Sequence, residues 1–141
     1  MLKGIPASIS PDLMKILMEM GHGDELVIAD GNFPAASCAN RLVRHDGHGT
    51  IPLLEDILTL FPLDEYVNAP AILMAVENGD TQPPIWEAYH SIISKLSDDL
   101  AAIAYVDRFS FYERARKAYA IIATSEKALY ANILLKKGVI S

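Results

Sequence analysis

Continuous apolar runs are the clearest pattern along this chain, and each of them predicts a β-strand. Within a run the hydrophobic residues follow one another, without the alternation that marks a strand with one face in water. Strands of this kind are typical of a sheet that other elements cover on both faces. The runs lie at residues 25–29, 71–76, 101–106, 119–124 and 132–135.

Apolar residues at helical spacing occupy most of the intervals between these runs. The first helix is predicted to begin after the capping residue Ser10 and to end at Gly21. A later helix is predicted to start at a Ser-x-x-Glu capping box, Ser110 to Glu113, and to reach Lys117. Two more are predicted at 52–61 and after Pro83-Pro84, and another begins near Pro34 in the loop-like segment 30–50.

The alternation of helices and strands predicts the fold class α/β. We expect a three-layer αβα sandwich around a largely parallel or mixed sheet, in a single domain over residues 1–141. The composition adds one point, because 51% of the residues are hydrophobic and the mean hydropathy is +0.20. Either the strands are buried on both faces, or other subunits cover part of the apolar surface.

Net charge and cysteine content limit the binding partners and the compartment that we expect for this protein. The net charge of −6 argues against nucleic acid, because a phosphate backbone would be repelled. The single cysteine, Cys38, excludes an intramolecular disulfide and fits a reducing compartment. Lys3 is followed by Gly-Ile-Pro rather than an apolar stretch, and no apolar run reaches the length of a membrane span. We therefore expect a cytoplasmic protein that binds neither nucleic acid nor membrane.

Candidate chemistry lies beside the predicted strands. Ligands of open α/β sheets bind beyond the carboxyl ends of the strands. Asp30 directly follows the strand at 25–29, Arg108 follows the strand at 101–106, and His22 stands between two glycines ahead of the first strand. These three side chains could form a polar pocket for proton transfer. Equally, Asp30 and Arg108 could form a structural ion pair, with His22 a solvated turn residue.

The tripeptide Tyr130-Ala131-Asn132 offers a hydroxyl, a backbone group and an amide, which suit the recognition of sugar hydroxyls. It could also be an ordinary turn with a packed tyrosine. Because the tripeptide precedes its strand, it can join Asp30 only if that strand is antiparallel or if a neighbouring subunit completes the site.

Other side chains give weaker signals. His45, Asp46 and His48 could bind a metal, but their loop lacks the spacing of a zinc motif, so no metal site is predicted. The residues around Cys38 give no reason for a reactive thiol, and Trp86 and Tyr89 are interpreted as core. No dinucleotide-binding fingerprint, phosphate-binding loop or nucleophile elbow is present, so no cofactor is expected.

Taken together, several segments resemble the L-fucose mutarotase and D-ribose pyranase family. The matching segments keep their order over nearly the whole chain and lie at residues 9–13, 19–25, 29–34, 108–115 and 130–139. The fucose branch is the closer one, because Arg108 and the Phe-Tyr-Glu-Arg sequence that ends at Arg114 match it.

The resemblance implies an isomerase that converts a free sugar, here L-fucose, between anomers without a cofactor. It implies that His22 is a proton donor and that Tyr112 is a second proton-transfer group. It further implies a ring-shaped homo-oligomer, such as a decamer, with sites shared between subunits. The implied sugar-binding residues are Asp30, Asp64, Met74, Arg108, Tyr130, Ala131 and Asn132.

Three other functions stay open at this point. The chain could be a non-catalytic monosaccharide-binding module associated with sugar uptake, using the same pocket. It could be a pyranase that acts on ribose. It could also carry metal-dependent chemistry through His22, His45 and His48.

Overall fold

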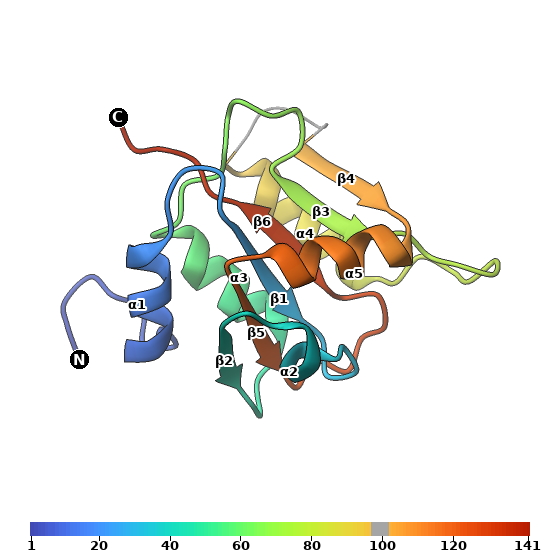
Figure 1. The fold of residues 1–141 in the computed structure, drawn as a ribbon, viewed down its shortest axis with the longest axis horizontal. Helices are drawn as coiled ribbons and strands as arrows, with labels where there is room; N and C mark the ends of the chain where they lie inside the picture. The colour runs from blue at the N-terminus through green and yellow to red at the C-terminus, as the bar shows by residue number, and fades with distance from the viewer. Residues whose placement is uncertain (97–101) are drawn as a thin grey trace.

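A mixed sheet forms the centre of the fold in the computed structural model, which describes residues 1–96 and 102–141 (Figure 1). Within those residues the sheet has six strands in the order β2-β5-β1-β6-β3-β4. The strands are β1 Glu25–Ala29, β2 Leu42–His45, β3 Ala71–Met74, β4 Ile103–Val106, β5 Ala120–Thr124 and β6 Ile133–Lys136.

The direction of β6 sets it apart from the other strands. It pairs antiparallel with β1 and with β3, whereas β1–β5, β2–β5 and β3–β4 are parallel pairs. The segment that precedes β6 therefore lies at the same edge of the sheet as the segments that follow β1 and β3. This is the antiparallel arrangement that the sequence left open for residues 130–132.

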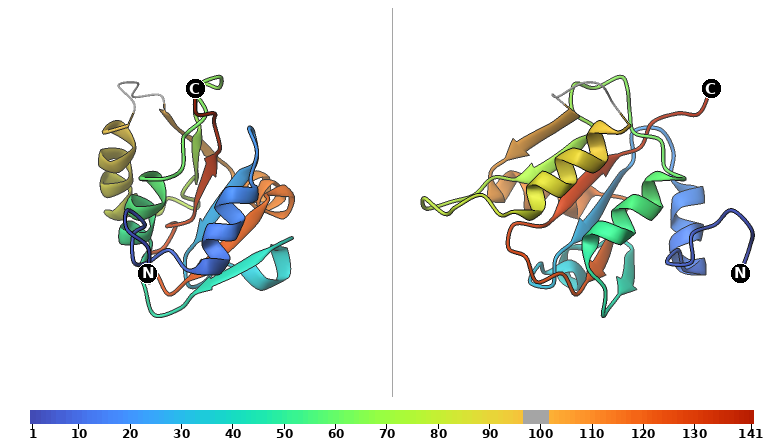
Figure 2. Two further views of the ribbon diagram at one scale, coloured as in Figure 1. Left: turned by 90° about the vertical axis from the view of Figure 1, so that its left-hand side faces the viewer. Right: turned by 180° about the vertical axis from the view of Figure 1, so that it is seen from behind.

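Helices cover both faces of the sheet, which confirms the predicted three-layer α/β fold (Figure 2). In β1, Leu26 and Ile28 point to one face and Val27 and Ala29 to the other, and all four are fully buried. One face packs against α1 Pro11–Glu19, α3 Thr50–Leu58 and α4 Ile85–Ser94; the other packs against α2 Ala35–Cys38 and α5 Arg108–Lys117.

Strand β2 was not predicted. It is an edge strand in which only Val43 is buried, and Arg44 and His45 make the segment polar. Such a strand lacks both the apolar run and the alternation from which strands are recognised. Residue 101, the start of the predicted strand 101–106, lies outside the described residues.

The predicted capping box at Ser110 is wrong, because α5 begins two residues earlier, at Arg108. Asp107 is the N-cap, and its carboxylate accepts hydrogen bonds from the backbone N–H of Ser110 at 2.9 Å and from its hydroxyl at 2.8 Å. Arg108 is thus the first helical residue directly after β4. No helix among residues 1–96 and 102–141 is long and apolar enough to cross a membrane.

Candidate functional site

A cavity of about 240 Å³ lies beyond the carboxyl ends of β1 and β3. Its walls come from the end of β3, from the segments after β1 and β3, from the segment before β6 and from the first two turns of α5. The structure brings together here most of the predicted sugar-binding residues and the predicted proton-transfer residue Tyr112. The predicted residues that line it are Asp30, Met74, Arg108, Tyr112, Tyr130 and Asn132.

Asp30 is buried at one end of this cavity, and the backbone holds its carboxylate in place. One oxygen accepts from the backbone N–H groups of Asn32 and Phe33, both at 3.0 Å, and the other accepts from that of Ala131 at 3.3 Å. Burial raises the pKa of Asp30, and these hydrogen bonds oppose the rise. The carboxylate is therefore fixed in position before any ligand arrives.

The segment before β6 completes the polar wall. The side-chain oxygen of Asn132 accepts from the backbone N–H of Asp30 at 2.7 Å. The hydroxyl of Tyr130 donates to Asp80 at 2.6 Å, and Asp80 and Glu77 line the cavity as well. Neither of these two acidic residues was predicted, because the segment after β3 carries no motif.

Arg108 and Tyr112 face the cavity from successive turns of α5. The guanidinium carbon of Arg108 lies 5.4 Å from the centre of the Tyr112 ring, which in turn packs against Phe33 with 5.0 Å between ring centres. The ion pairs among the described residues do not include one between Asp30 and Arg108. The structural ion pair that the sequence allowed is thus not formed, and the exposed Arg108 faces the cavity instead.

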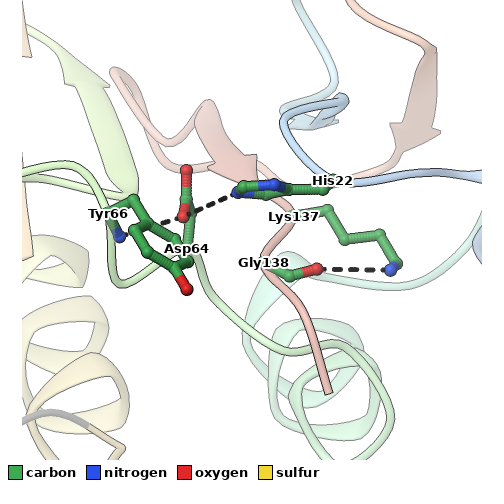
Figure 3. Close-up of polar contacts among 5 residues, drawn as sticks. All are labelled: His22, Asp64, Tyr66, Lys137 and Gly138. Atoms are coloured by element: carbon green, nitrogen blue, oxygen red, sulfur yellow. Dashed lines mark hydrogen bonds and ion pairs between the residues drawn. The ribbon is translucent and has the colours of Figure 1, made fainter. Parts of the chain in front are cut away.

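His22 lies outside this cavity, in the loop that enters β1 (Figure 3). Its Nε2 is 3.2 Å from a carboxylate oxygen of Asp64, which is buried while the imidazole is about half exposed. The ring of Tyr66 packs against the imidazole with 5.4 Å between centres. The five residues of β1 alone separate His22 from Asp30 by roughly 17 Å, so one chain does not bring them together.

Hydrogen bonds fix the carboxylate of Asp64 as an acceptor beside His22. The backbone N–H of Tyr66 donates to it at 3.0 Å, and this bond, together with that to His22, lowers the pKa of Asp64 below its usual range. A charged carboxylate on Nε2 favours the tautomer that carries hydrogen there, which leaves Nδ1 free to exchange a proton. Figure 3 shows the pair beside the end of the β6 segment.

Two glycines shape this second location. Gly23 adopts the left-handed conformation with φ +87°, which turns the chain between His22 and β1. Gly138 lies so close to the backbone of Leu63 that a Cβ atom there would come within 2.5 Å of its carbonyl oxygen. Gly138 thereby allows the segment that carries Asp64 to pack against the extension of β6.

His45, Asp46, His48 and Cys38 are the residues that the sequence offers only as weak candidates for metal or thiol chemistry. Within residues 1–96 and 102–141 no three potential ligands cluster around a metal-sized space. His45 and His48 stack on one another at 4.5 Å, while Asp46 binds Arg44 at 2.9 Å. Cys38 is buried in α2, away from the cavity.

Comparison with known proteins finds similarity over nearly the whole chain to proteins named fucose mutarotases. An L-fucose mutarotase of Actinobacillus pleuropneumoniae is 49% identical over 99% of this chain and 97% of its own, and a human fucose mutarotase is 48% identical over 99% and 95%. A crystal structure of the fucose mutarotase of Streptococcus pneumoniae in complex with L-fucose superposes with a TM-score of 0.96, at 56% identity, 99% coverage of this chain and 100% of that one.

The family resemblance inferred from the sequence is also confirmed by a match to a known family. Residues 3–140, nearly the whole chain, match the family described as the RbsD / FucU transport protein family. The chain therefore belongs to the RbsD / FucU family.

Proposed function

We propose that this protein interconverts the α and β anomers of free L-fucose, without a cofactor, at a site shared by two copies of the chain. The observation that carries the activity is full-length similarity to proteins named L-fucose mutarotase, one of them in complex with L-fucose. The cavity supports the substrate class, because its 240 Å³ lies just below the roughly 300–1,000 Å³ that is common for ligand sites. A cavity of this size suits a single sugar ring.

The charges that line the cavity favour a neutral sugar. Asp30, Glu77 and Asp80 supply carboxylates that accept hydrogen bonds from hydroxyl groups, and Arg108 supplies donors. Three acidic side chains against one basic side chain would repel a sugar phosphate or a sugar acid. The site is therefore suited to a free, uncharged monosaccharide.

Mutarotation requires two proton transfers. A base removes the proton of the anomeric hydroxyl, an acid protonates the ring oxygen, and the bond between the anomeric carbon and the ring oxygen breaks. Rotation of the aldehyde and the reverse proton transfers close the ring as the other anomer. We assign one transfer to His22, which Asp64 orients, and the other to the hydroxyl of Tyr112.

The separation of His22 from Tyr112 and the cavity supports a site shared by two copies of the chain. The cavity holds sugar-binding side chains but no imidazole, and His22 lies at the opposite end of β1. Exposed apolar side chains lie at both places: Leu129 on the cavity wall is 62% exposed and Tyr66 beside His22 is 79% exposed. If one copy covers the cavity of the next with its His22 loop, repetition of this contact closes a ring when the rotations between copies add up to a full turn. We propose such a ring, a decamer, in the cytoplasm, where the free thiol of Cys38 stays reduced.

Saturation-transfer NMR on L-fucose tests the proposal. Saturation of the α-anomeric proton should spread to the β-anomeric proton faster when the protein is added, with D-ribose as the comparison sugar. Binding of L-fucose without faster exchange would replace the enzyme by a sugar-binding module. Faster exchange between ring forms of D-ribose, with L-fucose unaffected, would make it a pyranase instead.

A further inference from the structure

We infer that helix α4 positions the sugar-binding segment of the cavity through two hydrogen bonds to successive backbone carbonyls. The indole N–H of Trp86 donates to the carbonyl of Tyr130 at 2.8 Å, and the hydroxyl of Tyr89 donates to the carbonyl of Ala131 at 2.7 Å. Trp86 and Tyr89 do not line the cavity, so both act through the segment that they hold. The inference rests on the proposed function and extends it to residues that the sugar does not reach.

Residues 130–131 need support from other elements, because the backbone conformation of Tyr130 is unfavourable. Tyr130 adopts φ +53°, a left-handed conformation that residues with a side chain rarely take. Such a conformation persists only where the surroundings fix it. With the carbonyls of Tyr130 and Ala131 turned toward α4, the N–H of Ala131 faces Asp30 and the phenol of Tyr130 reaches Asp80.

A chain of buried groups fixes the direction of these bonds. A carbonyl can only accept, so the hydroxyl of Tyr89 must donate to Ala131. The hydroxyl of Thr50 lies 2.5 Å from that of Tyr89 and is the donor of that pair when Tyr89 bonds to Ala131. It also lies 3.3 Å from the carboxylate oxygen of Glu126 that accepts the backbone N–H of Thr50 at 3.0 Å. Burial raises the pKa of Tyr89 far above its usual value, which keeps the donor proton in place.

The packing of α4 alone does not require these donors. Trp86 is 4% exposed and Tyr89 is fully buried, so a phenylalanine at either position would keep most of the apolar contact. What a phenylalanine would lose is the donor for one carbonyl. A role in the core alone predicts lower stability, whereas a positioning role predicts weaker sugar binding in a protein that remains folded.

The test compares Tyr89→Phe with Tyr105→Phe. Both substitutions remove one hydroxyl. The hydroxyl of Tyr105, on β4, lies 2.5 Å from the imidazole of His90, on α4, and Tyr105 does not line the cavity. For Tyr89→Phe we expect the KM for L-fucose anomer exchange to rise about tenfold or more, with a smaller change in kcat, because the binding groups move. Tyr105→Phe should keep wild-type values. A folded Tyr89→Phe with unchanged KM would overturn the inference.

A second variant and a second measurement protect the test. Thr50→Val removes the hydroxyl behind Tyr89 and should raise KM in the same direction by a smaller factor; it serves if Tyr89→Phe does not fold. Amide hydrogen exchange at Ala131, measured without sugar, should accelerate in either variant, while that of Val27 in β1 stays unchanged. If the wild-type protein did not accelerate anomer exchange, the proposed function would fail, yet the amide measurement would still decide for or against positioning by α4.

Discussion

The two ends of the sheet carry opposite kinds of chemistry. At the carboxyl end of β1, Asp30 is buried and tied to backbone N–H groups inside a cavity. At the amino end, His22 is about half exposed and rests on a single carboxylate, that of Asp64. The first arrangement is suited to holding a ligand in a fixed pose, and the second to exchanging protons with something that approaches from outside.

Asp30 and Asp64 show what decides the direction of a carboxyl pKa shift. Asp30 is 5% exposed and Asp64 is 3% exposed, yet the pKa of Asp30 is raised and that of Asp64 is lowered. Burial dominates at Asp30, whereas the hydrogen bond from Tyr66 dominates at Asp64. The exposed fraction of the residue therefore does not decide the direction of the pKa shift: desolvation outweighs three backbone donors at Asp30, whereas the donor Tyr66 outweighs desolvation at Asp64.

The largest effect is expected from the exposed end. His22→Gln keeps a side chain of similar size and polarity but cannot shuttle a proton near neutral pH. The rate of L-fucose anomer exchange should fall by about 10²- to 10⁴-fold, while L-fucose binding to the cavity is retained. The matched control is His90→Gln, because His90 is exposed on α4 and does not line the cavity. Equal losses in both variants would remove His22 from the mechanism.

The second test asks whether the cavity and the His22 of one site come from one chain or from two. Asp30→Asn impairs the cavity and His22→Gln impairs the proton-transfer group. Each variant alone should be nearly inactive, but co-expressed chains should form some sites with an intact cavity from one copy and an intact His22 from the other. Anomer exchange well above that of both parents is expected. Activity of the mixture no higher than the average of the parents would place the site within a single chain.

A smaller loss is expected when the imidazole loses its partner. Asp64→Asn removes the charged acceptor that selects the tautomer of His22, so kcat should fall on the order of 10- to 100-fold, the worth of a hydrogen bond to a charged group. KM should change little. Asp46→Asn is the control, since Asp46 is also ion-paired, with Arg44, but lies away from both locations. An unchanged kcat in Asp64→Asn would show that His22 needs no orientation.

The smallest effect concerns stability against pH, and its sign differs between the two ends. The lowered pKa of Asp64 stabilises the fold above the ordinary value of 3.8, and this contribution is lost as pH falls through the folded-state pKa. The raised pKa of Asp30 imposes a cost that appears as pH rises above 3.8. In urea unfolding, the free energy by which wild type exceeds Asp64→Asn should therefore shrink in acid. The free energy of unfolding of wild type relative to Asp30→Asn should fall as pH rises. Slopes of equal sign would contradict these assignments.

The sequence predicted the layers of the fold and much of the cavity. Apolar runs revealed the buried strands, and the position of Asp30 directly after one of them indicated the ligand-binding edge. The direction of β6 could not be predicted, because an apolar run such as residues 133–135 has the same pattern whether the strand is parallel or antiparallel. That direction decides where Tyr130 lies. The catalytic and binding roles of these residues stay predictions until the variants are measured.

Other features left no readable pattern. Asp64 follows a proline-ended helix with no motif around it, and only the family resemblance pointed to it. The interpretation of Trp86 and Tyr89 as core residues is correct for their burial. It missed their donors, because the partners are backbone carbonyls more than forty residues away, at 130 and 131, and backbone groups have no identity in a sequence.

The reversed strand β6 has a consequence for how neighbouring sites communicate. Its first residues follow directly on Asn132 at the cavity, and Gly138, just beyond its end, packs beside Asp64. In the proposed ring, β6 would act as a rod that connects the binding half of one site to the proton-transfer half of the adjacent site. Around a closed assembly, such rods would link every unit to its neighbours. Deleting one residue within the rod would turn all of its later side chains to the opposite face, and would damage two catalytic units at once.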